Sequence, residues 1–203
     1  MKGKGQGALR PLPFFISALV LAVSAAAPPA AIRMADVAAQ AGLTLLNVHG
    51  DGSGDYILDT NGNGAAFFDF DNDGNLDALI VNGSTRDRLA RGGDRMAALY
   101  RGDGRGHFTD VTASSGLAAR GWGMGTCIAD VDNDGFDDVY VTAYGPNVLY
   151  RNMGSSTGPR FKDVTQQAGV GDVRWSTGCA FGDYNRDGFV DLYVANYVSF
   201  DAR

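Results

Sequence analysis

Three Asp-rich loops of nine residues recur in this chain, and each lies between two short apolar runs. They read DFDNDGNLD from Asp69 to Asp77, DVDNDGFDD from Asp130 to Asp138, and DYNRDGFVD from Asp183 to Asp191. Carboxylate or amide side chains therefore occupy loop positions 1, 3, 5 and 9, and glycine always occupies position 6. Calcium takes about 6 to 8 oxygen ligands in a flexible shell. Each loop could therefore wrap one calcium ion.

A hairpin turn without metal is the alternative interpretation of the same loops. Asp and Asn side chains readily bond their own backbone, and glycine reaches positive φ at little cost. Three copies in one register favour the metal, because several carboxylates in one short loop repel one another unless a cation neutralises them. The sequence therefore predicts about three calcium ions, one in each loop.

The runs that flank the loops are short and rich in β-branched and aromatic residues, which predicts strands. Ala65 to Phe68 precedes the first loop, and Ala78 to Val81 follows it. An EF-hand would instead need a Glu at position 12 and a helix on either side. Position 12 is Ile80, Val141 or Val194, so each loop is expected to join two strands of a hairpin.

The composition and the spacing of the loops both predict an all-β fold. All 23 acidic residues are aspartate, which favours turns and loops, and 29 glycines suit many short strands. The loops begin 61 and 53 residues apart, which suits one four-stranded sheet per repeat. Such a period indicates propeller blades or a solenoid. Trp122 and Trp175 each lie eight residues before a loop and are expected to pack between blades.

Together these repeats resemble FG-GAP/VCBS repeats, which form calcium-binding β-propellers. The loops, LYRN at 149–152 and FKDVTQQAGV at 161–170 carry the resemblance, which covers residues 34–203. It is nearest to a secreted group resembling cartilage acidic protein, in which an ASPIC/UnbV domain usually follows the propeller; the integrin α-subunit propeller is more distant. The resemblance implies an all-β, partial β-propeller of about three blades.

The same resemblance implies calcium ligands at positions 1, 3, 5, 7 and 9 of every loop, with position 7 contributing its backbone carbonyl. These residues are Asp69, Asp71, Asp73, Asn75 and Asp77; Asp130, Asp132, Asp134, Phe136 and Asp138; Asp183, Asn185, Asp187, Phe189 and Asp191.

The repeats also suggest that the chain is an N-terminal fragment of a longer propeller. Met34 to Leu43 resembles the end of a blade, and the chain stops about two strands into its third loop-bearing blade. The ASPIC/UnbV domain is absent, and propellers typically have 4 to 8 blades. We therefore expect C-terminal blades to be missing, and poor autonomous stability with sheet edges prone to association.

Residues 1–31 are a sequence of another kind, with the pattern of a secretory signal peptide. Basic residues precede an apolar stretch from Phe14 to Val23, and small residues follow. The stretch is too short for a comfortable membrane span, which needs about 20 residues. We expect cleavage between Ala26 and Ala31 and a propeller segment, 32–203, that is secreted, periplasmic or on the cell surface, with no membrane span.

Two cysteines, Cys127 and Cys179, lie three and four residues before their loops. This spacing places them on opposite faces of equivalent strands. We therefore predict two small buried hydrophobes rather than a disulfide.

The remaining signals separate a binding module from an enzyme. The net charge is −6, and no cluster of basic and aromatic residues suggests nucleic-acid binding. The two histidines, His49 and His107, have no evident catalytic partner, and there is no Gly-x-Ser-x-Gly elbow. We expect a module for interaction with, or adhesion to, an unknown protein or carbohydrate ligand. The alternative is part of a lyase or glycosidase acting on an acidic polysaccharide, with Asp137 and Asp138 as acid and base.

Overall fold

We describe the protein from a computed structural model that places residues 33–155 and 159–199. Its contacts divide the chain into two units, Met1–Ala35 and Asp36–Arg203, and every helix and strand of the described residues lies in the second. The predicted signal peptide lies outside the described residues. The description that follows concerns the second unit by itself.

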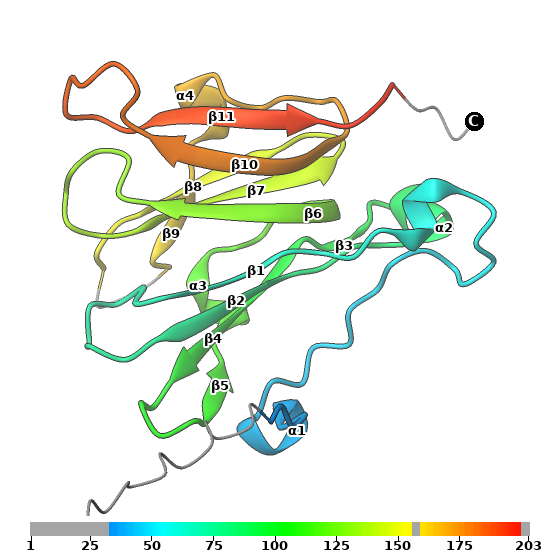
Figure 1. Ribbon diagram of the computed structural model, residues 1–203, viewed down its shortest axis with the longest axis horizontal. Helices are drawn as coiled ribbons and strands as arrows, with labels where there is room; N and C mark the ends of the chain where they lie inside the picture. The colour runs from blue at the N-terminus through cyan, green and yellow to red at the C-terminus, as the bar shows by residue number, and fades with distance from the viewer. Residues whose placement is uncertain (1–32, 156–158, 200–203) are drawn as a thin grey trace, which may run out of the picture. The chain divides into compact units, whose positions relative to one another are not determined.

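The first repeat folds into a four-stranded antiparallel sheet, which we name blade 1 (Figure 1). Its strands, in spatial order, are β1 (Ala65–Phe68), β2 (Asp77–Val81), β4 (Ala97–Gly102) and β5 (Phe108–Asp110). Phe68 lies opposite Asp77 in the β1–β2 hairpin, so loop 1 (residues 69–77) closes that hairpin. The predicted unit of strand, loop and strand is confirmed.

Blade 2 repeats the same strand order around loop 2 (residues 130–138). Its strands are β6 (Arg120–Ala129), β7 (Asp138–Tyr144), β8 (Val148–Asn152) and β9 (Phe161–Asp163). A two-residue strand, β3 (Asp94–Arg95), pairs with the start of β6 and makes this sheet five-stranded. One four-stranded sheet per repeat was the prediction, and β3 is the addition that the repeat pattern did not reveal.

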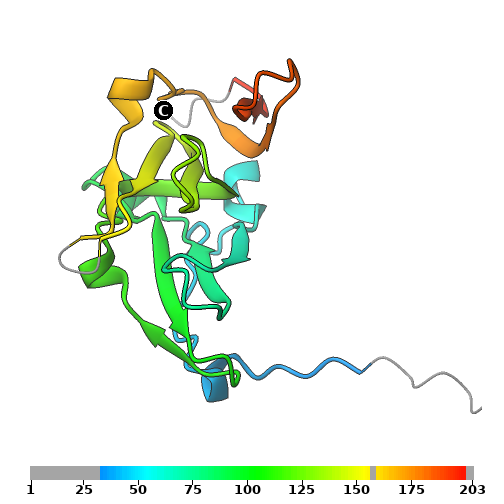
Figure 2. The ribbon, with the colours of Figure 1, turned by 90° about the vertical axis from the view of Figure 1, so that its left-hand side faces the viewer.

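Blade 3 consists of the hairpin β10 (Ser176–Gly182) and β11 (Asp191–Asn196) around loop 3 (residues 183–191). The three sheets follow one another in chain order, and all three loops lie on one side of them, at the left in Figure 1 and facing the viewer in Figure 2. The fold is therefore an all-β, partial β-propeller. Strands flank every loop, so the prediction that these are not EF-hands is also confirmed.

The helices of the described residues are single turns, as expected for a chain without glutamate. They are α1 (Ala38–Ala41), η1 (Ile57–Thr60), α2 (Arg86–Leu89), α3 (Thr112–Ser115) and α4 (Thr165–Ala168). Three of them, α1, α3 and α4, follow a valine and end at a glycine in the left-handed region. Helix α1 thus has the form of the turns that close blades 1 and 2, in agreement with the resemblance of residues 34–43 to a blade end.

Apolar side chains from neighbouring blades form one continuous core. Leu79 and Leu99 of blade 1 and Val139 and Val141 of blade 2 are all fully buried and belong to the same cluster. Burying a side chain of this size stabilises the fold by about 1.5 to 3 kcal/mol. A second cluster contains Trp122 and Trp175, at 0% and 3% exposure, which confirms that they are packing residues.

Glycine allows the inner strands of successive blades to approach closely. Gly64 and Gly125 each lie five residues before their loops. A Cβ atom on Gly64 would come within 3.0 Å of the Gly125 Cα, and one on Gly125 within 3.0 Å of the Thr177 carbonyl oxygen. The Gly64 N–H also donates to the Met124 carbonyl at 2.8 Å. The backbones of β6 and its neighbours therefore meet without intervening side chains.

The prediction that the cysteines are free is wrong. Cys127 of β6 and Cys179 of β10 form a disulfide, with their Cα atoms 5.9 Å apart. The two residues do occupy opposite faces of equivalent strands, but consecutive blades stack face to face. One face of a sheet therefore packs against the opposite face of the next sheet. Two cysteines on opposite faces of equivalent strands, such as Cys127 and Cys179, come into contact in this arrangement.

Candidate calcium sites

The three loops have nearly the same backbone conformation. The glycine at position 6 has a φ of 85°, 88° and 91° in loops 1, 2 and 3. The residue at position 4 is also left-handed, with φ of 57° for Asn72, 57° for Asn133 and 64° for Arg186. Asn tolerates this region better than most residues, and glycine enters it at no steric cost. The loop sequence therefore specifies a tight turn that points its side chains inward.

The carboxylate at position 1 organises each turn. In loop 1, Asp69 accepts hydrogen bonds from the N–H groups of Asp73 at 3.0 Å and Gly74 at 2.8 Å. Asp130 and Asp183 make the equivalent pairs of bonds in loops 2 and 3. These are the Asx bonds of a metal-free hairpin turn, and they do not by themselves point to an ion.

The carboxylate at position 9 is buried beneath the loop in blades 1 and 2. Asp77 accepts from Phe70 N–H at 3.0 Å and from Gly102 N–H, on the third strand, at 2.8 Å. Asp138 is held in the same way by Val131 and Asn152. Burial raises the pKa of Asp77 and raises the pKa of Asp138 to about 6, against the effect of these hydrogen bonds. A bound cation would favour the charged carboxylates that burial disfavours.

The carboxylate at position 3 of loops 1 and 2 has one buried oxygen that makes no hydrogen bond. The Asp71 side chain is 6% exposed, and its Oδ1 is buried without a hydrogen bond. Asp132 Oδ1 is in the same state in loop 2. An unsatisfied buried polar atom costs about 1 to 3 kcal/mol, and more when it belongs to a charged group. These two oxygens are therefore available to a bound cation.

Positions 1, 3 and 9 come together in loops 1 and 2. Each of Asp69, Asp71 and Asp77 offers an oxygen within 4.8 Å of the other two, and Asp130, Asp132 and Asp138 do the same. Hard carboxylate oxygens at this density fit calcium. The structure thus assembles six of the predicted ligands into two carboxylate groups.

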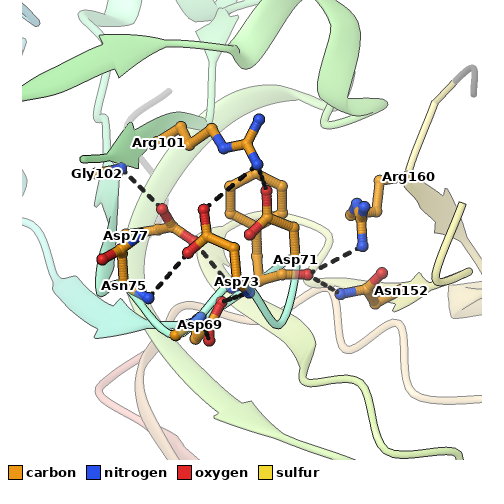
Figure 3. Close-up of polar contacts among 11 residues, drawn as sticks. Asp69, Asp71, Asp73, Asn75, Asp77, Arg101, Gly102, Asn152 and Arg160 are labelled. Atoms are coloured by element: carbon orange, nitrogen blue, oxygen red, sulfur yellow. Dashed lines mark hydrogen bonds and ion pairs between the residues drawn. The ribbon is translucent and has the colours of Figure 1, made fainter. Parts of the chain in front are cut away.

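Position 5 is turned toward an arginine. In loop 1 the Arg101 guanidinium lies between Asp71 and Asp73, with Nη2 2.5 Å from Asp71 Oδ2 and 3.3 Å from Asp73 Oδ2 (Figure 3). The other oxygen, Asp73 Oδ1, accepts from the N–H of Asn75, at position 7. Arg151 contacts Asp132 and Asp134 of loop 2 in the same way. The position-5 carboxylates, Asp73 and Asp134, are therefore not among the carboxylates that come together in loops 1 and 2.

Loop 3 has the same turn but a different set of side-chain contacts. Asn185 replaces aspartate at position 3, and its amide donates to Asp187 Oδ2 at 3.1 Å. Asp191 accepts from Tyr184 N–H at 3.1 Å. The described part of β11 pairs with β10 alone, so Asp191 is without the third-strand N–H that Gly102 and Asn152 supply in the other blades. Phe136 and Phe189 occupy position 7 of loops 2 and 3. The backbone N–H of each donates a hydrogen bond to the position-5 carboxylate of its own loop.

Sequence reasoning missed the residues that link the loops to one another and to the third strands. The Asn72 amide donates to the Gly135 carbonyl at 2.9 Å, and Asn133 donates to Gly188 at 3.0 Å. Loops 1 and 2 thus each bond to the position-6 glycine of the loop that follows. The repeated Leu-Tyr-Arg of β4 and β8 was the available signal for Arg101 and Arg151, because it occurs in both repeats.

Asp137, at position 8 of loop 2, is affected electrostatically by carboxylates of both loop 1 and loop 2. Its pKa is raised by burial first, and then by the charges of Asp130 in its own loop and Asp69 in loop 1. It extends the negative potential of loop 2 toward loop 1, which a divalent cation would relieve. Asp137 and Asp138 both contribute negative charge to loop 2. Two backbone N–H groups donate hydrogen bonds to the carboxylate of Asp138.

The sheets, the loops and their repetition define a class of protein, and two overlapping segments, residues 81–141 and 130–194, match the FG-GAP-like repeat. Together they span more than half of the chain, which therefore belongs to the FG-GAP-like repeat family. The chain is similar to cartilage acidic protein 1, with 34% identity over 92 residues to the protein of Xenopus tropicalis. It is 33% identical over 90 residues to the proteins of Mus musculus and Homo sapiens.

These alignments take in 44% or 43% of this chain, and 14%, 14% and 13% of the frog, mouse and human relatives. The chain therefore matches about one seventh of their length. Within residues 33–155 and 159–199, no helix has the length and apolarity needed to cross a bilayer.

Proposed function

We propose that this chain is an exported, calcium-binding β-propeller module that interacts with, or adheres to, a protein or carbohydrate ligand. Its calcium ions are structural, and each fixes one hairpin where blades meet. The ions are held by the side chains of positions 1, 3, 5 and 9 and by the carbonyl of position 7, the residues expected from the sequence. Calcium supplies positive charge in loops that otherwise concentrate carboxylates.

One observation carries the calcium proposal. Asp71 and Asp132 each have a buried, unbonded Oδ1 atom, and each offers a carboxylate oxygen within 4.8 Å of oxygens of positions 1 and 9. A metal-free turn explains the Asx bonds of position 1, but it leaves these two oxygens without a partner. A calcium ion satisfies them and offsets the mutual repulsion of three carboxylates.

Two further features support export and interaction. The disulfide between Cys127 and Cys179 is typical of proteins in oxidising compartments outside the cytosol, where free calcium is also plentiful. Large apolar side chains are exposed on the loops: Leu76 at 61%, Tyr184 at 84% and Phe189 at 54%. Exposed apolar groups gathered on one side of a protein favour a binding surface.

Calorimetric titration of calcium into the chelator-treated protein tests the calcium proposal. The protein is expressed from the whole 203-residue sequence in a secreting host, so that the disulfide can form. We expect binding of about three ions and a higher melting temperature with calcium. Binding without stabilisation would contradict a structural role, and no binding at millimolar calcium would refute the proposal.

Matched variants assign the ions to loops. Asp71→Asn and Asp132→Asn each remove one position-3 charge, which gives the loop the residue that Asn185 supplies in loop 3, and should each weaken calcium binding at one site. Asp87→Asn, on the exposed surface of α2, removes the same charge away from the loops and should leave calcium binding unchanged. The interaction role is tested by binding the calcium-loaded protein to panels of extracellular-matrix proteins and polysaccharides, with and without chelator. Absence of binding in every case would contradict that role.

A further inference from the structure

An arginine from the third strand of each complete blade reaches into a calcium loop. Arg101 projects from β4 and pairs with the carboxylates of positions 3 and 5 in loop 1, as Figure 3 shows. Arg151 projects from β8, and its Nη2 lies 3.2 Å from Asp134 Oδ2 while its Nε contacts Asp132 Oδ2. The same pairing thus occurs in two blades.

The two carboxylates in each pair are left in different states. At position 3 the arginine contacts Oδ2 and leaves Oδ1 buried and unbonded, in a residue whose carboxylate lies beside those of positions 1 and 9. At position 5 the arginine takes Oδ2, and a backbone N–H takes Oδ1, at 2.8 Å in loop 1 and 3.0 Å in loop 2. An ion can therefore bind position 3 through an unbonded oxygen, but at position 5 it competes with a partner already on each oxygen.

The charge of the loop determines whether the arginine or the backbone N–H leaves the position-5 carboxylate. The ion-free loop 1 contains the carboxylates of Asp69, Asp71, Asp73 and Asp77, and Arg101 is the cation paired with it. A calcium ion offsets two of those four negative charges, so the attraction for the guanidinium falls, and the two cations repel each other. The arginine therefore stabilises the ion-free loop more than the filled loop, which weakens calcium binding.

We propose that Arg101 and Arg151 are built-in counter-ions of loops 1 and 2. Each holds its ion-free loop in place, gives up the position-5 carboxylate when calcium enters, and thereby sets the calcium affinity of that loop. The inference rests on the proposed calcium function and adds residues that contribute no ligand atom. In loop 3, within the described ranges, no arginine side chain makes an ion pair of this kind.

Arg101→Gln and Arg151→Gln test the inference by titration in the full 203-residue protein. Each substitution should tighten calcium binding at one site by up to about fivefold, the range expected for loss of a partly exposed ion pair. Each should also lower the melting temperature in chelator by more than in saturating calcium. Arg101→Lys keeps the charge but not the planar fork that spans two carboxylates, so its affinity should lie between those of wild type and Arg101→Gln.

Arg88→Gln is the matched control. Arg88 is 50% exposed, close to the 51% of Arg101, and pairs with Asp94 at 3.2 Å outside the loops. Its removal should leave every calcium affinity unchanged. Unchanged or weaker binding in both loop-arginine variants, with normal binding by wild type, would overturn the counter-ion role and leave the calcium function intact. A wild type that binds no calcium would instead overturn both.

Discussion

The side-chain amide of Asn152 donates a hydrogen bond to the carbonyl of Phe70, 82 residues earlier in the chain, at 2.8 Å. The same nitrogen donates to the Asp137 carbonyl at 3.2 Å, and Asn152 is fully buried. One side chain of blade 2 therefore holds the backbone of loops 1 and 2 together. Figure 3 shows Asn152 beside loop 1, together with Arg160, which also reaches the Phe70 carbonyl.

Asn152→Ala should destabilise the protein by about 1 to 3 kcal/mol, because it removes the main donor from two buried carbonyls. Urea unfolding in chelator measures the loss without a contribution from calcium. Gln166→Ala removes an exposed amide from α4 and serves as the control, with an expected change within about 0.5 kcal/mol. Equal stability of the two variants would show that Asn152 does not link the loops energetically.

Replacing both cysteines, Cys127→Ala and Cys179→Ala, should lower the free energy of unfolding by about 4 kcal/mol. The disulfide closes a segment with a sequence separation of 52 residues, and loops of that size lose this much entropy in the unfolded chain when cross-linked. The measurement is urea unfolding of the oxidised wild type, the reduced wild type and the variant. A variant as stable as oxidised wild type would contradict the expectation.

Gly125→Ala should destabilise the protein by about 1 to 3 kcal/mol, because its Cβ would meet the Thr177 carbonyl and the Thr142 hydroxyl at 3.0 Å. Gly178→Ala is the natural control. It occupies the same place five residues before its loop, and its Cβ would have nothing within 4 Å among the described residues. Thermal melts of both variants should separate them clearly, and a well-tolerated Gly125→Ala would argue against close stacking of the blades.

Stability should fall as the pH rises above 10. Burial raises the pKa of Tyr150 from 10.0 to about 12. A raised tyrosine pKa means that the folded protein prefers the neutral phenol, so its contribution is complete below pH 10 and is lost between pH 10 and pH 12. The loss amounts to about 3 kcal/mol at most. Tyr150→Phe should remove this part of the alkaline decline in urea unfolding, and identical pH profiles would refute the assignment.

The hairpins and blades could be predicted from the sequence because their signals are local. The apolar run before Asp69 and the one after Asp77 became β1 and β2, and glycine at position 6 took the positive φ that the turn requires. The carboxylate groups of loops 1 and 2 follow from the same nine-residue pattern.

The contacts between repeats could not be predicted in this way. Which face of β6 meets which face of β10 depends on how the sheets stack, and strand periodicity reveals only which residues share a face. The disulfide was mispredicted for that reason. The roles of Arg101 and Asn152 were missed because each acts on a loop far away in the sequence, through a third strand whose position follows from the assembled blade.

The bonds from Asn72 to Gly135 and from Asn133 to Gly188 run forward along the chain, over 63 and 55 residues. A ribosome makes the donor of each bond well before it makes the acceptor. The first hairpin can close on itself early, but its position-4 amide meets its native partner only after the first strand of the following blade has been made. Neither bond can form until the next repeat is present, so each of these two loops depends for one contact on the blade that follows it.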